Sequence, residues 1–194
     1  MLSDDKVLFI GDGSGWSFLA ATQLRRICPK IETVFWDYGT PQPTSHVGWI
    51  GDHIFTFKAD LLLSDAVLSK TRKTAINFHP APPLYRGVGG YHFALADGQR
   101  KFGATCHYID TQIDHGQIIA VDRFPIYEEE TTESLMDRTA HVCLGLFYRI
   151  IDRLDKTGAL ELAQNEAWGS HLYTRKQLAR SIKSTRKSKQ LSTA

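Results

Sequence analysis

The first 60 residues place a strand, a turn and a helix in succession, and this unit restricts the fold more than any other feature of the chain. The apolar run Lys6–Ile10 ends at a glycine and is typical of a buried parallel strand. Residues 16–27 then carry apolar side chains at helical spacing and stop before a Cys-Pro pair. Two more strand candidates follow over 31–36 and 54–57, joined by a connection rich in Pro, Gly and Thr. This alternation predicts an α/β fold.

The middle of the chain supplies further elements of both kinds. We expect a short helix over 61–69, a strand end over 74–77 and a helix over 91–96. Residues 104–109 and 117–124 are consecutive strand candidates, which either pair as a hairpin or flank a long loop.

The longest helix is predicted after residue 130. Thr131 or Thr132 can cap its start, and Gly158 can end it. Between them, apolar residues from Leu135 to Leu154 fall on one helical stripe. We interpret the methionine and aromatic side chains of this stripe as core packing rather than as a cofactor site.

Length, composition and cysteine content set broad limits. At 194 residues the chain suits one domain, and a hydrophobic content of 42% is ordinary for a soluble protein and too high for a disordered one. Cys28, Cys106 and Cys143 are widely spaced and lack a metal or redox pattern, so we interpret them as reduced and structural. The chain shows neither a signal-peptide pattern nor a run long enough to span a bilayer, and we expect it in the cytoplasm.

Positive charge is concentrated near the end of the chain. Residues 175–194 hold seven Lys or Arg and no acidic residue, whereas the preceding residues carry 16 basic and 21 acidic side chains. Such a tail either contacts nucleic acid or an anionic surface, or forms a solvated and partly disordered terminus. We favour the second interpretation and expect neither a nucleic-acid nor a membrane partner.

One strand delivers an amide and an imidazole, two residues apart, into a loop stiffened by prolines. Asn77 and His79 point the same way because side chains alternate along a strand. Prolines at 80, 82 and 83 fix the backbone and hold neighbouring groups in place. Open α/β sheets bind ligands at the carboxyl ends of their strands. An isolated Asn-x-His pair would more simply satisfy a turn, but the stiffened segment up to Gly87 favours catalysis.

A second block, Gly103–Ile119, runs from a strand through a polar loop into another strand. It carries Thr105 and His107 on one face, and an Asp-x-Gly turn that begins at Asp114. Together the two blocks resemble the family of formyltransferases that use a formylated tetrahydrofolate. The signature of that family joins an Asn-x-His-Pro segment to a Gly-x-Thr-x-His strand and an Asp-x-Gly turn. The resemblance spans about residues 52–126.

The resemblance implies an architecture as well as a chemistry. It implies a Rossmann-like three-layer sandwich of α/β type with a mostly parallel sheet. This sandwich would be somewhat reduced, because the stretch between Trp36 and Asp52 is short for the family. We divide the chain into a catalytic domain over residues 1–160 and a C-terminal extension with the basic tail over residues 161–194.

Carried over position by position, the resemblance implies that Asn77, His79 and Asp114 form a catalytic trio. Formyl transfer to an amine passes through a tetrahedral centre whose oxygen gains negative charge, and Asn77 and a protonated His79 can both donate to it. The amine must also lose a proton, which is a task for a carboxylate near an imidazole. Asp114 either performs this task or mainly keeps His79 protonated. No metal is expected.

Other residues receive supporting or binding roles. Thr105 and His107 match family positions that line or brace the site. Arg86 pairs either with an anionic group of the substrate or with a surface carboxylate, and Asp110 is interpreted as a loop cap. In this family the pterin of the folate binds the segment before the Asn-x-His strand, although the leucines there would also suit the core. We assign cosubstrate contacts to Phe57, Leu61, Leu62, Leu63 and Ser64.

The first turn of the chain contains Gly13 and Ser14 between a strand and a helix. Backbone N–H groups at this place either hold a substrate phosphate or simply close a tight turn. The turn is not a dinucleotide fingerprint, because Trp16 stands where the third glycine is required.

The resemblance implies transfer of a formyl group from 10-formyltetrahydrofolate, the expected cosubstrate, to a primary amine. The segments Phe78–Gly87 and Tyr173–Lys176 look most like sugar N-formyltransferases, which favours an amino-sugar nucleotide as the small-molecule partner. Phosphoribosylglycinamide formyltransferase of purine synthesis is the first alternative. A hydrolase that releases formate from formyltetrahydrofolate and a non-catalytic relative are the others. A tRNA substrate is not expected, since no C-terminal β-barrel follows, and a homodimer is allowed for.

Overall fold

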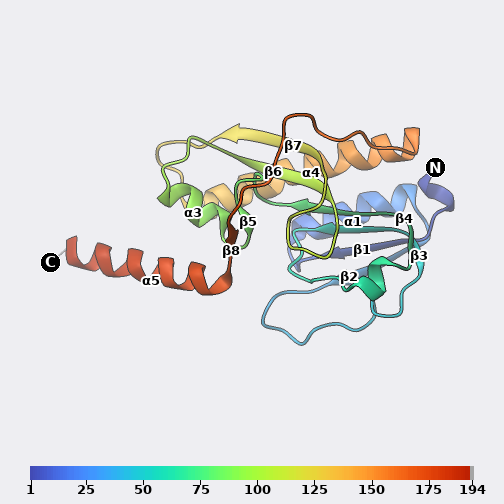
Figure 1. Ribbon diagram of the computed structural model, residues 1–194, viewed down its shortest axis with the longest axis horizontal. Helices are drawn as coiled ribbons and strands as arrows, with labels where there is room; N and C mark the ends of the chain where they lie inside the picture. The colour runs from blue at the N-terminus through green and yellow to red at the C-terminus, as the bar shows by residue number, and fades with distance from the viewer. Residues whose placement is uncertain (193–194) are drawn as a thin grey trace.

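A six-stranded sheet forms the centre of the protein, as seen in a computed structural model that describes residues 1–192, and their side chains up to residue 184 (Figure 1). The strand order is β2-β1-β3-β4-β6-β7. The first four strands in this order are parallel, and β6 runs antiparallel to both of its neighbours. The mostly parallel sheet confirms the predicted α/β class. The strands are β1 (Val7–Gly11), β2 (Ile31–Phe35), β3 (Gly51–Phe57), β4 (Thr71–His79), β6 (Lys101–Tyr108) and β7 (Ile118–Pro125).

Two long helices, α1 (Gly15–Ile27) and α4 (Thr132–Thr157), lie against one face of the sheet. Every second strand residue points to this face, and the ring of Phe147 on α4 packs against Phe9 and Phe78 at centroid distances of 6.0 and 4.8 Å. Fully burying one such side chain stabilises a fold by about 1.5–3 kcal/mol. These contacts fix α4 across the strands that carry the candidate catalytic residues.

The ends of α4 follow from its sequence. Thr131 is the N-cap, and its side chain and that of Ser134 each bind the other's backbone N–H. Gly158 ends the helix in the left-handed conformation, with φ 70°. The predicted longest helix is therefore confirmed.

All three cysteines are free and buried in the core between the sheet and the two long helices. Burial raises the pKa of the Cys106 and Cys143 thiols. Neutral, enclosed thiols of this kind are unreactive, as the structural interpretation requires.

The opposite face of the sheet has a thinner cover. Leu8 and Ile54 pack there against Trp49, which belongs to the β2–β3 connection, and against Leu61. The helix predicted over 61–69 is shorter than expected, because only Asp65–Leu68 (α2) is helical. The residues before it run irregularly, with Leu61 drawn into the core. This face therefore carries one helical turn and loops, which leaves room for a site beside the carboxyl ends of the strands.

The C-terminal part of the chain returns to the loops of the sheet. β8 (Leu172–Tyr173) pairs in parallel with β5 (Arg86–Gly87), which precedes α3 (Gly90–Ala96). α5 (Arg175–Ser192) then extends away from the rest of the molecule (Figure 1). The boundary at residue 160 remains a prediction.

A partly disordered tail was expected from residue 175 onward, and α5 corrects this. The segment is rich in helix-forming Lys, Arg, Gln and Leu, and its first turns rest on the body of the protein. Leu178 lies over Gly89, and His92 Nε2 is 2.9 Å from Ser181 Oγ. Residues 193 and 194 of the predicted basic tail lie outside the described part. Within residues 1–192, no helix is both long and apolar enough to cross a membrane.

Candidate active site

Asn77 and His79 lie at the carboxyl end of β4 and point away from α4. Phe78 between them is buried under Phe147, so its two neighbours face the thinly covered side of the sheet. The antiparallel register sets Asn77 opposite His107 and His79 opposite Thr105. The two sequence blocks thus meet as adjacent strands.

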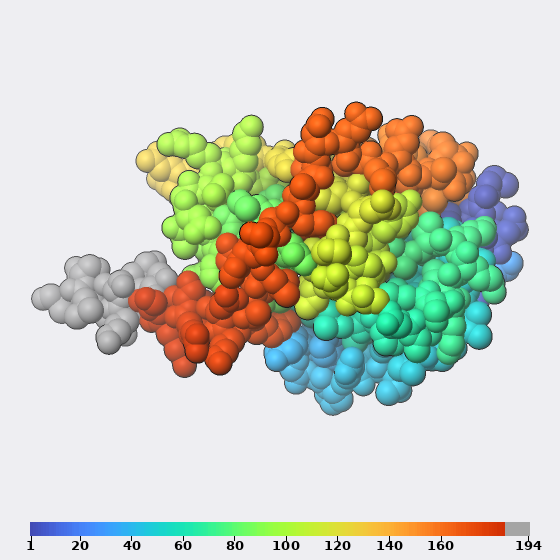
Figure 2. Space-filling model, in the orientation of Figure 1, coloured from blue at the N-terminus to red at the C-terminus, as the bar shows by residue number. Residues whose placement is uncertain are grey.

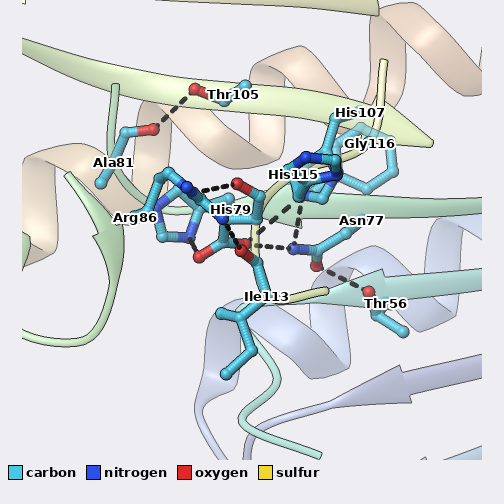
Figure 3. A network of polar contacts seen from close by, with 12 residues as sticks. Thr56, Asn77, His79, Ala81, Arg86, Thr105, His107, Ile113, His115 and Gly116 are labelled. Atoms are coloured by element: carbon cyan, nitrogen blue, oxygen red, sulfur yellow. Dashed lines mark hydrogen bonds and ion pairs between the residues drawn. The ribbon is translucent and has the colours of Figure 1, made fainter. Parts of the chain in front are cut away.

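The amide of Asn77 has a defined orientation (Figure 3). Its Oδ1 accepts a hydrogen bond of 2.6 Å from the Thr56 hydroxyl. Its Nδ2 lies 3.3 Å from Asp114 Oδ1 and 3.0 Å from His107 Nε2. A carboxylate oxygen can only accept from the amide, which supports this assignment of Nδ2. Asn77 therefore presents its N–H groups toward the middle of the cluster.

His79 is nearly enclosed, with 6% of its surface exposed. Its Nε2 lies 2.8 Å from the carbonyl oxygen of Tyr85, so this nitrogen carries a proton. Its Nδ1 lies 3.4 Å from Asp114 Oδ2. The ring of His79 therefore joins the loop after β4 to the carboxylate of Asp114.

Asp114 comes from the loop between β6 and β7 and adopts the left-handed region, with φ 44°. Its Oδ2 accepts a bond of 2.7 Å from the backbone N–H of Gly87. Burial raises the pKa of Asp114, but the charge of His79 and the contacts with His107 and Gly87 outweigh it and lower the pKa to about 2. The carboxylate is therefore ionised at neutral pH.

Arg86 holds the loop that carries Asp114. Its Nε donates to the carbonyl of Asp114 at 2.7 Å, and its Nη2 donates to the carbonyl of Ile113 at 3.0 Å. In the structure the partners of Arg86 are backbone carbonyls and not a surface carboxylate, and a contact with an anionic group of the substrate stays a prediction. Every residue has a backbone carbonyl, so a sequence pattern cannot indicate which carbonyls an arginine binds. The role of Arg86 in holding the Asp114 loop was therefore not predicted.

Two predicted supporting residues brace the cluster. Thr105 donates a bond of 2.7 Å to the carbonyl of Ala81 and so ties the proline-rich loop to β6. His107 Nδ1 lies 2.8 Å from the carbonyl of Tyr108, which leaves Nε2 to face Asn77. Asp110 accepts a bond from the backbone N–H of Gln112, which matches its predicted use as a loop cap.

The first turn satisfies its own donors. The N–H of Gly13 donates to Asp37 at 2.9 Å and that of Ser14 to Asp12 at 3.2 Å. Asp12 also pairs at 2.8 Å with Lys58, whose side chain is 9% exposed. Two carboxylates thus stand where a phosphate would bind, which favours the tight-turn interpretation of Gly13 and Ser14.

The predicted cosubstrate segment divides between core and surface. Phe57 and Leu61 are buried, Leu62 is 64% exposed, Leu63 is half-buried and Ser64 is exposed. Among described residues, the backbone groups of 59–63 have no backbone hydrogen-bond partner. Such free N–H and C=O groups suit a heterocycle rich in donors and acceptors. Any cosubstrate contacts here would therefore come from the backbone and Leu63 more than from the other leucines.

The sequence analysis missed Trp168, which lies after α4. Its ring is 4.9 Å from that of His107 and 6.2 Å from that of His79. Residues 159–167, which precede this tryptophan, follow neither a helical nor a strand pattern that would mark it. The orange and red segment that carries it runs over the loop before β7 in Figure 2.

The comparisons with known proteins agree with this geometry. The sequence model of the formyl transferase family matches residues 52–151, which hold Asn77, His79 and Asp114. The methionyl-tRNA formyltransferase of Moorella thermoacetica is 32% identical over 111 residues, covering 57% of this chain and 36% of the relative. The chain thus spans about a third of the length of that relative.

Two solved structures share the fold. The N-formyltransferase of Helicobacter canadensis, in complex with folinic acid and dTDP-3-aminofucose, superimposes with a TM-score of 0.73 at 18% identity over 88% of this chain and 71% of its own. The formyltransferase PseJ of Anoxybacillus kamchatkensis has a TM-score of 0.69 at 19% identity, over 91% and 89% of the two chains. With the family match across half of its residues and this shared fold, the chain belongs to the formyl transferase family.

Proposed function

We propose that this protein transfers the formyl group of 10-formyltetrahydrofolate to a primary amine on an amino-sugar nucleotide. One observation carries the proposal: Asn77, His79 and the ionised Asp114 lie together at the carboxyl end of β4, with polar atoms 3.3–3.4 Å apart. These are the groups that formyl transfer to an amine needs.

Each group has a part in the reaction. When the amine attacks the formyl carbon, the carbonyl oxygen gains negative charge, which N–H groups of Asn77 and an imidazolium at His79 stabilise. The nitrogen of the amine must lose a proton and the folate nitrogen must gain one as the C–N bond breaks. Asp114, at 3.4 Å from His79, accepts the proton of the amine directly or through water. The same proton then passes to the folate nitrogen as the C–N bond breaks, so the carboxylate is ionised again at the end of the reaction.

The acceptor class rests on analogy. Structures of similar fold are described with an amino-sugar nucleotide and with a formamido-sugar nucleotide, next to folate compounds. Among sequence relatives, methionyl-tRNA formyltransferases recur, but two of these matches cover only 36% and 40% of the relative. The nucleotide-sugar acceptor is therefore the favoured class, in a protein that we expect in the cytoplasm.

A direct assay tests the proposal. The purified protein is incubated with 10-formyltetrahydrofolate and a panel of amino-sugar nucleotides, glycinamide ribonucleotide and methionyl-tRNA, and both tetrahydrofolate and the mass of each acceptor are followed. We expect a mass gain of one formyl group on an amino-sugar nucleotide. Transfer to glycinamide ribonucleotide or to tRNA alone would refute the acceptor class, and formate release without any acceptor would establish a hydrolase instead.

A further inference from the structure

Trp168 lies against both imidazoles of the candidate site from a segment outside the sheet. Its ring stands edge-on to His107, with an interplanar angle of 87°, and inclined by 61° to His79. Edge-on contacts of this kind stabilise an aromatic pair beyond the area that they bury. Trp168 is half-buried while residues 165, 167 and 170 are exposed, so the indole is the inward-facing group of its stretch.

The indole is anchored at its polar end. Trp168 Nε1 donates a hydrogen bond of 2.7 Å to the carbonyl of Gly116, two residues after Asp114. Gly116 itself cannot carry a side chain, since a Cβ there would lie 1.9 Å from the carbonyl oxygen of Tyr108. One indole thus bridges the two imidazoles and the loop that holds the carboxylate.

The segment around the indole is tied to the loop after β4. The N–H of Gly169 donates to the carbonyl of Pro83 at 3.0 Å, and Arg86 Nη1 reaches the carbonyl of Gly169 at 3.5 Å. The β5–β8 pairing continues this attachment. Arg175 then stacks over the ring of Tyr38. Trp168 therefore cannot shift without the loops that frame the site.

The orientation of the His107 ring determines whether it can accept a hydrogen bond from the amide N–H of Asn77. A carbonyl can only accept, so the contact with Tyr108 places a proton on His107 Nδ1. His107 Nε2 lies 3.0 Å from Asn77 Nδ2 and 3.4 Å from Asp114 Oδ1; because the amide nitrogen can only donate, Nε2 accepts from it at the shorter contact. A turn of the imidazole about its own bond would break both contacts. The centroid of the Trp168 ring lies 4.9 Å from that of His107, so the indole packs directly against the imidazole and opposes such a turn.

We propose that Trp168 is a positioning residue of this site, which holds His107 in the ring orientation and tautomer that aim the amide of Asn77. The consequence for turnover rests on the proposed formyl transfer, whereas the consequence for His107 does not. The aromatic ring of Trp168 contacts the imidazoles, and its Nε1 anchors that ring at Gly116.

Substitutions at Trp168 can be matched by a control in the same protein. Trp16 is also half-buried, stands edge-on to a histidine at 5.8 Å and donates through Nε1 to Asp137 at 3.3 Å, but lies between α1 and α4. Trp168→Ala and Trp168→Leu remove the aromatic ring that packs against His79 and His107, whereas Trp168→Phe keeps an aromatic ring there. Trp16→Ala removes an indole with similar contacts at another place in the protein.

Two readouts follow each variant. Long-range ¹H–¹⁵N spectra report the imidazole nitrogens, with His107 assigned by His107→Gln. We expect a single ring state protonated at Nδ1 in the unchanged protein, Trp16→Ala and Trp168→Phe, and an averaged state in Trp168→Ala and Trp168→Leu. In turnover we expect kcat to fall roughly 10- to 100-fold in the latter two, with folate KM changed by less than about threefold, and partial recovery in Trp168→Phe.

The proposal is overturned if His107 keeps a single ring state in Trp168→Ala, as it is expected to do in Trp16→Ala. Where Trp168→Ala does not fold, Trp168→Leu decides by the same criterion. It is also overturned if folate KM rises while kcat stays constant. If the unchanged protein transfers formyl to no acceptor, the proposed function fails, and the ring state of His107 alone decides the part played by Trp168.

Discussion

Two imidazole–carboxylate clusters lie at opposite edges of the sheet, and β4 contributes to both. At the amino edge, His53 Nε2 is 3.0 Å from Asp5 Oδ2, and Lys73 Nζ is 2.6 Å from Asp5 Oδ1. At the carboxyl edge, His79 Nδ1 is 3.4 Å from Asp114 Oδ2. In the first cluster the imidazole–carboxylate distance is shorter, and Lys73 binds the second carboxylate oxygen. In the second cluster the imidazole–carboxylate distance is longer.

The difference separates a structural pair from a site. Both ring nitrogens of His53 are held at short range by side chains, since Nδ1 lies 2.6 Å from Thr74 Oγ1. Asp114 instead sits in a loop, in a strained backbone conformation. Its oxygens accept one short bond, of 2.7 Å from the N–H of Gly87, and their contacts with Asn77 and His79 are longer, at 3.3 and 3.4 Å. An imidazole beside a carboxylate therefore indicates catalysis only where loops leave the pair able to exchange partners.

The largest expected effect falls on the carboxyl edge alone. Asp114→Asn, Asn77→Ala and His79→Ala should each lower turnover roughly 10²-fold or more, because each removes a donor or a proton acceptor from the transition state. Asp114→Asn is the sharpest of these, since asparagine also tolerates the left-handed backbone. The measurement is steady-state turnover with the acceptor found in the panel.

Asp5→Asn is the matched control for that comparison. It neutralises the other carboxylate and should change turnover per folded molecule by less than about twofold. A loss of turnover in Asp5→Asn similar to that in Asp114→Asn would remove the distinction between the two clusters.

The free energy of unfolding should depend more on the cluster at the amino edge, around His53 and Asp5. His53→Ala deletes a buried ring that binds Asp5 and Thr74 and stacks on Phe55, which should cost about 2–4 kcal/mol of unfolding free energy. Urea denaturation measures it. The exposed His115, bonded to Asp110 at 2.7 Å, is the control, and His115→Ala should stay within about 0.5 kcal/mol. Equal losses in both variants would contradict a structural role for the amino-edge cluster.

Acid should weaken the same cluster. Burial lowers the pKa of His53 below its usual 6.5, against the opposing contact with Asp5. A folded state that binds the proton less well than the unfolded chain is most stable above pH 6.5 and loses stability as the pH falls through the folded pKa. We expect Tm to fall below about pH 6.5, and less steeply in His53→Ala. If Tm falls equally steeply with pH in the unchanged protein and in His53→Ala, the loss of stability in acid comes from groups other than His53.

The smallest effect is expected at the cation of the amino edge. The side chain of Lys73 is 50% exposed, so its pair with Asp5 is screened by solvent and salt. Lys73→Met should lower Tm slightly at low ionic strength, and the difference should vanish at about 1 M NaCl, where the Debye length is about 3 Å. A difference that persists at high salt would show that Lys73 acts through packing.

Much of the fold was predictable because its signals are local. The strands around the apolar run at Lys6, the helix begun by Thr131 and its end at Gly158 follow from periodicity and capping. The antiparallel pairing of β6 with β4 and β7 remained open, because strand order depends on contacts distant in sequence. The excess length predicted for α2 arose because three leucines resemble a helix, although Leu61 is used by the core.

The site was predictable only in its side chains. Asn77, His79 and Asp114 belong to two recognisable blocks, and the structure brings them together, although their roles stay predictions. Contacts made by backbone groups were not accessible, so the partners of Arg86 were missed. Trp168 was missed because its importance comes from a return of the chain that no local pattern announces.

The return of residues 163–175 to the loops has a consequence for how the molecule is made. During synthesis the N-terminal strands and α4 leave the ribosome first, and their core can form before this segment appears. Trp168, whose ring packs against His79 and His107, is synthesised later. A nascent chain paused after α4 would thus hold a folded sheet whose reaction centre is still open to water.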